Sequence, residues 1–156
     1  MNTIIGDYKQ YTFEEYVKYK LCKSDGVASL VQKKDLLILC KYAHLNGDKN
    51  MTKAQLFDLL ITSGYTHEDL ATLFRVGVSN RCYREKFKLT YDDVNYLGKC
   101  GLLRISGFSR YHAYGRTIRA PQYDVVQYVN MTDSEMNTLL QKLKSKKVTF
   151  EPWEVL

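Results

Sequence analysis

The sequence predicts a mainly helical fold with one β-hairpin, an α+β class. The helical part is predicted by a recurring pattern in which Thr is followed three residues later by Glu, Gln or Asp, next to apolar residues at helical spacing. The hairpin is predicted by two extended segments after Gly101, 102–106 (LLRIS) and 122–131 (QYDVVQYVNM), which are rich in branched and aromatic residues. With 156 residues, 45% of them hydrophobic, the chain can bury one sizeable core.

The helices are placed by their capping residues and by the glycines that follow them. The predicted ranges are 12–23, 30–46, 52–64, 66–77 and 90–101, and a last helix begins after Thr132. Glycine is the usual left-handed residue after a helix, so four glycines are expected to end helices: Gly47, Gly64, Gly77 and Gly101. The basic segment 79–88 (SNRCYREKFK) is predicted as a further short helix, with a loop as the alternative.

Two more segments complete the chain. Residues 107–121, which we call the arm, join the two predicted strands and are punctuated by Gly107, Gly115 and Pro121. The tail, residues 146–156, is predicted as a short strand or a docking segment anchored by Trp153.

Composition and motifs exclude several classes of protein. No apolar run approaches the ~18 residues of a membrane span, and the N-terminus does not read as a signal peptide, so we expect a cytoplasmic protein with no membrane partner. The four cysteines lack zinc-ligand spacing and are expected to be free, mostly buried thiols: Cys22, Cys40, Cys82 and Cys100. Nucleotide-binding, hydrolase and metalloprotease motifs do not occur in the sequence, so we expect no metal, no cofactor and no enzymatic activity.

Charge is distributed unevenly along the chain. All seven arginines lie between positions 75 and 119. This window contains ten cationic side chains and three carboxylates, a net charge of +7. The other 111 residues together carry −1. Arginine presents a flat fork of five donors that fits phosphate oxygens, so this segregation predicts phosphate binding.

The order of these elements resembles a winged-helix DNA-binding domain. The resemblance is carried by Val94, Leu97 and Gly101–Arg104 at the end of one helix, then by the arm, and then by Val129–Thr132 with Glu135 at the start of the next. It is similar to the segment of multiple-antibiotic-resistance-type repressors that contains the recognition helix and the wing, over roughly residues 52–143, but Gly77–Leu89 is a longer basic insertion.

This resemblance implies a domain organisation and a function. It implies an N-terminal helical extension at 1–28, a winged-helix-like domain at 29–145 and the tail at 146–156. It implies a DNA-binding regulator, or a replication or packaging accessory, of a bacterial, phage or mobile-element genome. The winged-helix regulators usually bind as dimers, so we also expect a homodimer.

The recognition helix is either 79–88 or 90–101. A second alignment places the helix-turn-helix at 66–87, and electrostatics favour 79–88 for the contacts because Asp92 and Asp93 lie in the first turn of the other helix. The predicted partner is duplex DNA, with RNA as the alternative. The predicted nucleic-acid-binding residues are Asn80, Arg81, Tyr83, Arg84, Lys86, Lys88, Arg104, Arg110, His112, Tyr114, Arg116 and Arg119.

Two other functions compete with DNA binding. The first is a protein-interaction inhibitor of a nucleic-acid-processing complex, whose basic face binds an acidic protein. The second is a metal-independent ribonuclease, because one segment supplies the base, acid and charge stabiliser that cleavage through a 2′-hydroxyl needs: Arg110, His112, Tyr114 and Arg116.

Overall fold

The computed structural model describes residues 3–6, 9–23, 30–145 and 154–155. Within these ranges the chain forms eight helices and two small antiparallel sheets, so the predicted α+β class is confirmed. Contacts divide the chain into two compact units, Met1–Val76 (unit 1) and Gly77–Leu156 (unit 2), whereas the sequence prediction placed its boundaries at 28 and 145. None of the described helices is long and apolar enough to cross a membrane.

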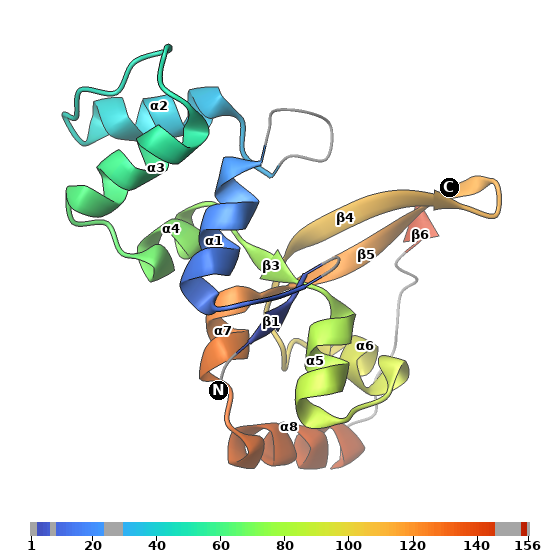
Figure 1. The fold of residues 1–156 in the computed structure, drawn as a ribbon. Helices are drawn as coiled ribbons and strands as arrows, with labels where there is room; N and C mark the ends of the chain where they lie inside the picture. The colour runs from blue at the N-terminus through green and yellow to red at the C-terminus, as the bar shows by residue number, and fades with distance from the viewer. Residues whose placement is uncertain (1–2, 7–8, 24–29, 146–153, 156) are drawn as a thin grey trace. The chain divides into compact units, whose positions relative to one another are not determined.

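Unit 1 is helical apart from a two-stranded sheet. Its elements are β1 (Ile4–Ile5), β2 (Gln10–Tyr11), α1 (Phe13–Cys22), α2 (Lys33–Tyr42), α3 (Lys53–Thr62) and α4 (His67–Leu73). Helix α1 packs on α3 and α4, and α2 packs on α3 (Figure 1). The residues expected as an N-terminal extension therefore contribute α1 to the core of unit 1, through the buried side chains of Val17 and Leu21.

Unit 2 combines a four-stranded antiparallel sheet with four helices. Its elements are β3 (Gly77–Val78), α5 (Asn80–Phe87), α6 (Tyr91–Lys99), β4 (Ile105–Ala113), β5 (Arg116–Asp124), α7 (Val125–Asn130), α8 (Asp133–Ser145) and β6 (Glu154–Val155). The strand order is β3-β5-β4, and β6 pairs with β5 as well. Strands β4 and β5 form a long two-stranded ribbon that extends beyond helices α5 and α6 (Figure 1).

The core of unit 2 is built around tyrosine. Tyr83 of α5 is fully buried, and its ring centroid lies 5.6 Å from that of Tyr123 in β5 and 4.9 Å from that of Tyr128 in α7. Both contacts are edge-on, the geometry that aromatic quadrupoles favour. The cluster therefore joins α5, the sheet and α7 at one point.

Five predicted helix starts are confirmed, whereas the helix predicted to start at Leu30 begins at Lys33, with Gln32 as its N-cap. Each of the five begins after a Thr whose hydroxyl accepts a hydrogen bond from the backbone N–H three residues later, as at Thr90, where Oγ1 lies 3.1 Å from the Asp93 nitrogen. The same capping arrangement occurs at Thr12, Thr52, Thr66 and Thr132. Segment 79–88 is the predicted short helix, α5.

Two predicted helix ends are wrong. Gly64 and Gly101 do take positive φ after α3 and α6, but α2 ends before His44, whose own φ is 58°, and Gly47 plays no part in that turn. Likewise α4 ends before Arg75, with φ 53°, and Gly77 is a residue of β3.

The predicted strand 122–131 is also wrong in its second half. Strand β5 ends at Asp124, whose carboxylate accepts the backbone N–H of Val126 at 3.1 Å and caps helix α7. Burial of Val125 and Tyr128, three residues apart, suits a helix packed on one side. Leu102 and Leu103 do not begin the other strand: their N–H groups close α6 on the Leu97 carbonyl.

The arm is not a connection between strands but the ribbon itself. Residues 107–121 fall within β4, the turn at 114–115 and β5. Of the tail, Glu154 and Val155 form β6, while Trp153 lies outside the described residues.

Gly77 offers a direct test of this sheet. A Cβ built there would lie 2.5 Å from Ser106 Oγ and 2.7 Å from Gln122 Cβ, so Gly77→Ala is expected to lower the free energy of unfolding by about 1–3 kcal/mol. Urea denaturation followed by circular dichroism measures this. Gly107→Ala is the matched control, because nothing lies within 4 Å of a Cβ built at Gly107. Equal effects of the two changes would contradict the packing of β3 on β5.

Candidate nucleic-acid interface

The ribbon has two distinct faces, because side chains alternate along a strand and directly paired residues share a face. The pairs Phe108 with Pro121, Arg110 with Arg119, and His112 with Thr117 lie on one face, which we call the arginine face. Along β5 this face also contains Tyr123, whose buried ring contacts Tyr83 of α5. The arginine face is therefore the outward continuation of the sheet face that α5 covers.

Two like charges are paired directly on the arginine face. Arg110 is exposed and Arg119 is half-buried, and their Cα atoms are register partners. Like charges at such positions destabilise a sheet pair unless an anion lies between them. No carboxylate occupies the β4 and β5 positions of this face, which are Phe108, Arg110, His112, Thr117, Arg119 and Pro121.

Neighbouring side chains hold these groups in place. The Arg119 guanidinium carbon lies 4.4 Å from the ring centroid of Phe108, a cation–π contact that orients the fork. The Nε atom of Arg119 is buried and has no hydrogen-bond partner among the described residues. Nδ1 of His112 lies 3.2 Å from Thr117 Oγ1, across the strands. The face therefore presents an oriented Arg119 guanidinium beside an aromatic ring.

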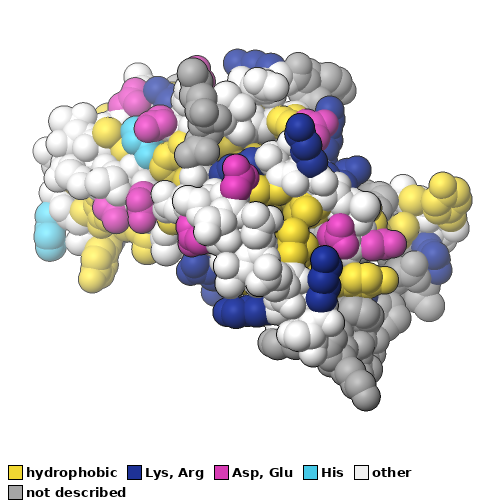
Figure 2. Space-filling model, turned by 90° about the horizontal axis from the view of Figure 1, so that it is seen from below, with side chains coloured by type: hydrophobic (Ala, Val, Ile, Leu, Met, Phe, Trp, Pro, Cys, Tyr) yellow, Lys and Arg dark blue, Asp and Glu magenta, His cyan; other side chains and the backbone are white. Residues whose placement is uncertain are grey.

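The space-filling view agrees with this composition. Figure 2 shows hydrophobic and basic side chains next to each other at the end of the ribbon, on the right of the view. Elsewhere on the face drawn, basic and acidic side chains both occur, and a second group of basic side chains lies at the lower edge of the molecule, left of the centre.

The predicted site residues of α5 are largely engaged within the protein. Arg81 Nε lies 3.2 Å from Glu85 Oε1, and the Lys86 ammonium donates a 2.6 Å hydrogen bond to the Tyr128 carbonyl. Burial lowers the pKa of Lys86. Arg84 is half-buried with its guanidinium 5.7 Å from the ring centroid of Tyr91. Lys88 is exposed and caps the end of the helix with φ 55°.

Two other predicted contact residues serve the fold. Tyr83 is fully buried, so its prediction as a nucleic-acid contact gives way to a packing role. The amide nitrogen of Asn80 donates to the Tyr91 carbonyl at 3.2 Å, which ties α5 to the start of α6. An aromatic residue in a basic helix fits either use, so the sequence alone did not decide between packing and contact for Tyr83.

The remaining predicted residues lie in or next to the ribbon. Arg104 is exposed but pairs with Asp124, with Nε to Oδ2 at 3.2 Å. Tyr114 and Arg116 are exposed at and beside the turn. The structure thus brings Arg110, His112 and Arg119 together on one face, and places Arg116 on the other face with Ala113.

Helix α6 carries fewer cationic side chains than α5 or the ribbon. Its exposed side chains include Tyr91, Asp92 and Tyr96, while Asp93 accepts the Thr90 N–H at 3.4 Å as part of the cap. The carboxylate of Asp93 is therefore committed to the helix start. Helix α5 carries more cations per residue than the ribbon, but Arg81 and Lys86 are engaged within the protein. The ribbon instead places Arg110 and Arg119 together on one face.

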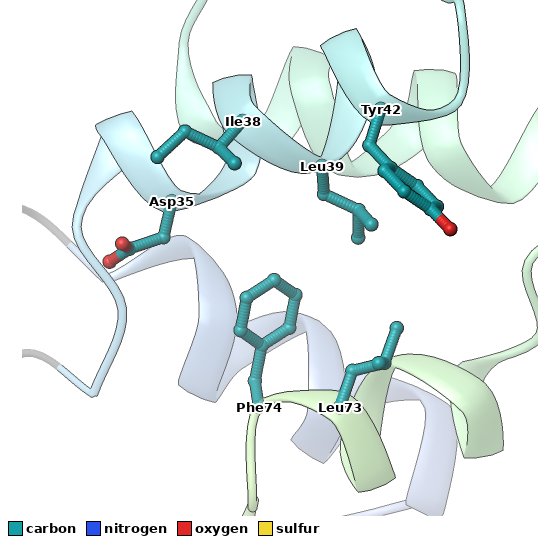
Figure 3. A pocket seen from close by; sticks show the side chains of 6 residues that line it. All are labelled: Asp35, Ile38, Leu39, Tyr42, Leu73 and Phe74. Carbon is teal, nitrogen blue, oxygen red and sulfur yellow. The ribbon is translucent and has the colours of Figure 1, made fainter.

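A separate apolar pocket lies in unit 1. It has a volume of about 380 Å³ and is lined by Asp35, Ile38, Leu39, Tyr42, Leu73 and Phe74. Leu39 and Tyr42 point from α2 toward Leu73 and Phe74 at the end of α4 (Figure 3). Among the described residues, no arginine or lysine lines this pocket, so these residues add nothing to an anion-binding surface.

The chain was also searched for other kinds of site. No group of three or more His, Cys, Asp or Glu side chains within the described ranges is arranged to hold a metal ion. None of the four cysteines forms a disulfide, and Cys40 and Cys82 are buried. Comparison of the chain with protein-family models, curated proteins and solved structures finds no match.

Proposed function

We propose that unit 2 is a winged-helix domain that binds duplex DNA, with the ribbon as its wing. The observation that carries the proposal is the direct pairing of Arg110 and Arg119 on a ribbon face without carboxylates. Two forks at that spacing offer paired donors to phosphate oxygens, and an anion between them removes their mutual repulsion.

The order of elements supports the same proposal. A strand, two helices and a two-stranded ribbon follow each other as β3, α5, α6, β4 and β5, and β5 lies in the middle of the sheet. In a winged helix the second of those helices is the recognition helix, which assigns this role to α6. The departure from the pattern is that α8 packs on α6, while α4 belongs to unit 1.

Binding of this kind would depend more on the wing than on the recognition helix. Asp92 is exposed in the first turn of α6, whereas the arginine face of the ribbon carries only neutral and basic groups. Phosphate contacts fix position and register without reading sequence. The proposed domain is therefore expected to bind duplex DNA with modest sequence preference.

Fluorescence anisotropy with a labelled duplex at several salt concentrations tests the proposal. We expect the logarithm of the binding constant to fall linearly with the logarithm of the salt concentration, with a slope of about −0.9 for each phosphate contacted. Two contacts on the arginine face set a minimum slope of about −1.8. Absence of binding to duplex DNA at low salt would refute the proposal.

The same measurements distinguish the rival functions. Tighter binding to double-stranded RNA than to DNA would support the RNA alternative. Cleavage of RNA in the presence of a chelator would support the ribonuclease, in which His112 acts as the base or acid. Binding to an acidic protein, together with no binding to duplex DNA, would support the inhibitor.

A further inference from the structure

The turn at the end of the ribbon has an unusual residue. Ala113 pairs with Arg116, so Tyr114 and Gly115 alone form the loop, and their φ angles are 54° and 75°. Two positive φ angles are those of a type I′ turn, which favours Asn-Gly or Gly-Gly. A tyrosine in the left-handed region is strained because its Cβ approaches the following carbonyl oxygen.

The side chain at this position is also exposed to an unusual degree. Tyr114 is 98% exposed, the largest fraction among the exposed large hydrophobic side chains of the described chain. Its ring therefore contributes no packing that offsets the strained backbone. The turn itself fixes the hairpin, but Asn or Gly would make it with less strain, so the choice of tyrosine points to a role in binding.

We propose that Tyr114 stacks on an unpaired DNA base, so that the ribbon binds a junction between duplex and single-stranded DNA in preference to uninterrupted duplex. This inference rests on the proposed function, since the arginine face must first hold the duplex backbone. The inference adds the substrate class: a fork, in which unpaired bases with open faces follow the duplex.

The geometry of the ribbon suits such a junction. Tyr114 follows Arg110 by four strand residues, a separation of ~13 Å at about 3.3 Å per residue. That length corresponds to roughly four base-pair steps of duplex at about 3.4 Å each. The arginines would contact backbone phosphates about four steps from the base on which the ring stacks.

The chemistry explains why a junction is preferred. Inside a closed duplex both faces of every base are covered, and inserting a ring requires two bases to unstack. At a fork the first unpaired base beyond the duplex has an open face, so the ring stacks on it without that cost. A single base–aromatic stack changes affinity by on the order of 10-fold or more.

Three proteins and two DNA molecules test the proposal. Wild type, Tyr114→Asn and Tyr114→Trp are each titrated with a blunt duplex and with a fork of the same duplex length that carries 2-aminopurine at the junction. Asparagine suits the left-handed turn but has no ring, whereas tryptophan keeps a ring. The melting temperature of each variant is measured beside its affinities.

We expect wild type and Tyr114→Trp to prefer the fork by on the order of 10-fold and to change the 2-aminopurine emission by stacking. Tyr114→Asn is expected to lose this preference, to bind blunt duplex as wild type does, and to melt at the same or a higher temperature. That combination separates a ligand contact from a structural contact.

Other outcomes overturn the proposal in distinguishable ways. If wild type binds blunt duplex with the expected salt dependence but shows no fork preference, this inference is wrong and the proposed function stands. If Tyr114→Asn melts lower and loses affinity for both DNA molecules equally, Tyr114 is a structural residue. If wild type binds neither DNA, both proposals are wrong.

Discussion

Replacing Arg110 and Arg119 together by Ala is expected to weaken duplex DNA binding by on the order of 100-fold at about 0.1 M salt. Hydrogen bonds to charged groups contribute about 1.5–3 kcal/mol each, so losing two phosphate contacts is enough for this change. The salt dependence should decrease as well, by a slope of about 1.8 for two contacts. Anisotropy titration at four or more salt concentrations gives both quantities.

The matched control removes the same charge from another element. Lys142 and Lys144 are exposed on α8, and the double change of these residues to Ala also lowers the net charge by two. If the two double variants lose affinity equally, binding follows net charge and the ribbon has no special role. An unchanged salt slope in the Arg110 and Arg119 variant would place the contact surface elsewhere.

The stability of the double variant is expected to change little. Arg110 and Arg119 are directly opposite on adjacent strands, and removing two facing like charges relieves their repulsion. Loss of the contact between Arg119 and the Phe108 ring offsets part of this gain. The double variant is therefore expected to unfold at nearly the same urea concentration as wild type, so its weaker binding will not reflect unfolding.

The helix starts were predictable because the capping signal is local. Thr12, Thr66 and Thr90 each use a partner three residues away, so the interaction is encoded entirely in the sequence of one turn. Helix ends were less predictable, because a glycine has other uses. Gly77 serves the close approach of β3 to Gln122, a contact with a residue 45 positions away.

The second half of the segment 122–131 shows how tertiary contacts override a local preference. Its valines and tyrosine favour a strand, but capping by Asp124 and burial of Val125 and Tyr128 on one side select a helix. The β-propensity of the residue types takes account of neither the Asp124 cap nor the burial on one side.

The candidate site was predicted by composition but not by geometry. Clustering of arginine indicated the segment that contains α5, α6 and the ribbon, yet which arginines share a face depends on the register of the ribbon. That register is fixed by the turn at Tyr114 and Gly115, which is not one of the usual hairpin dipeptides. Once the turn is known, alternation alone places Arg110 opposite Arg119.

The second large effect is expected in the core of unit 2. Tyr83→Ala should lower the free energy of unfolding by about 3–5 kcal/mol, because it removes a fully buried ring that contacts Tyr123 and Tyr128. The hydroxyl is expected to behave differently from the ring. Burial raises the pKa of Tyr83, and its oxygen has no hydrogen-bond partner among the described residues.

Two conservative variants separate ring from hydroxyl. Tyr83→Phe removes an unsatisfied buried hydroxyl and is expected to leave stability unchanged or to raise it by up to about 1 kcal/mol. Tyr128→Phe removes a hydroxyl that donates to the Cys82 carbonyl at 3.3 Å, and should cost about 0.5–1.5 kcal/mol. Urea denaturation followed by circular dichroism measures all three variants. A loss in Tyr83→Phe as large as that in Tyr128→Phe would mean that the Tyr83 hydroxyl is hydrogen-bonded, and it would contradict the assignment of Tyr83 to packing alone.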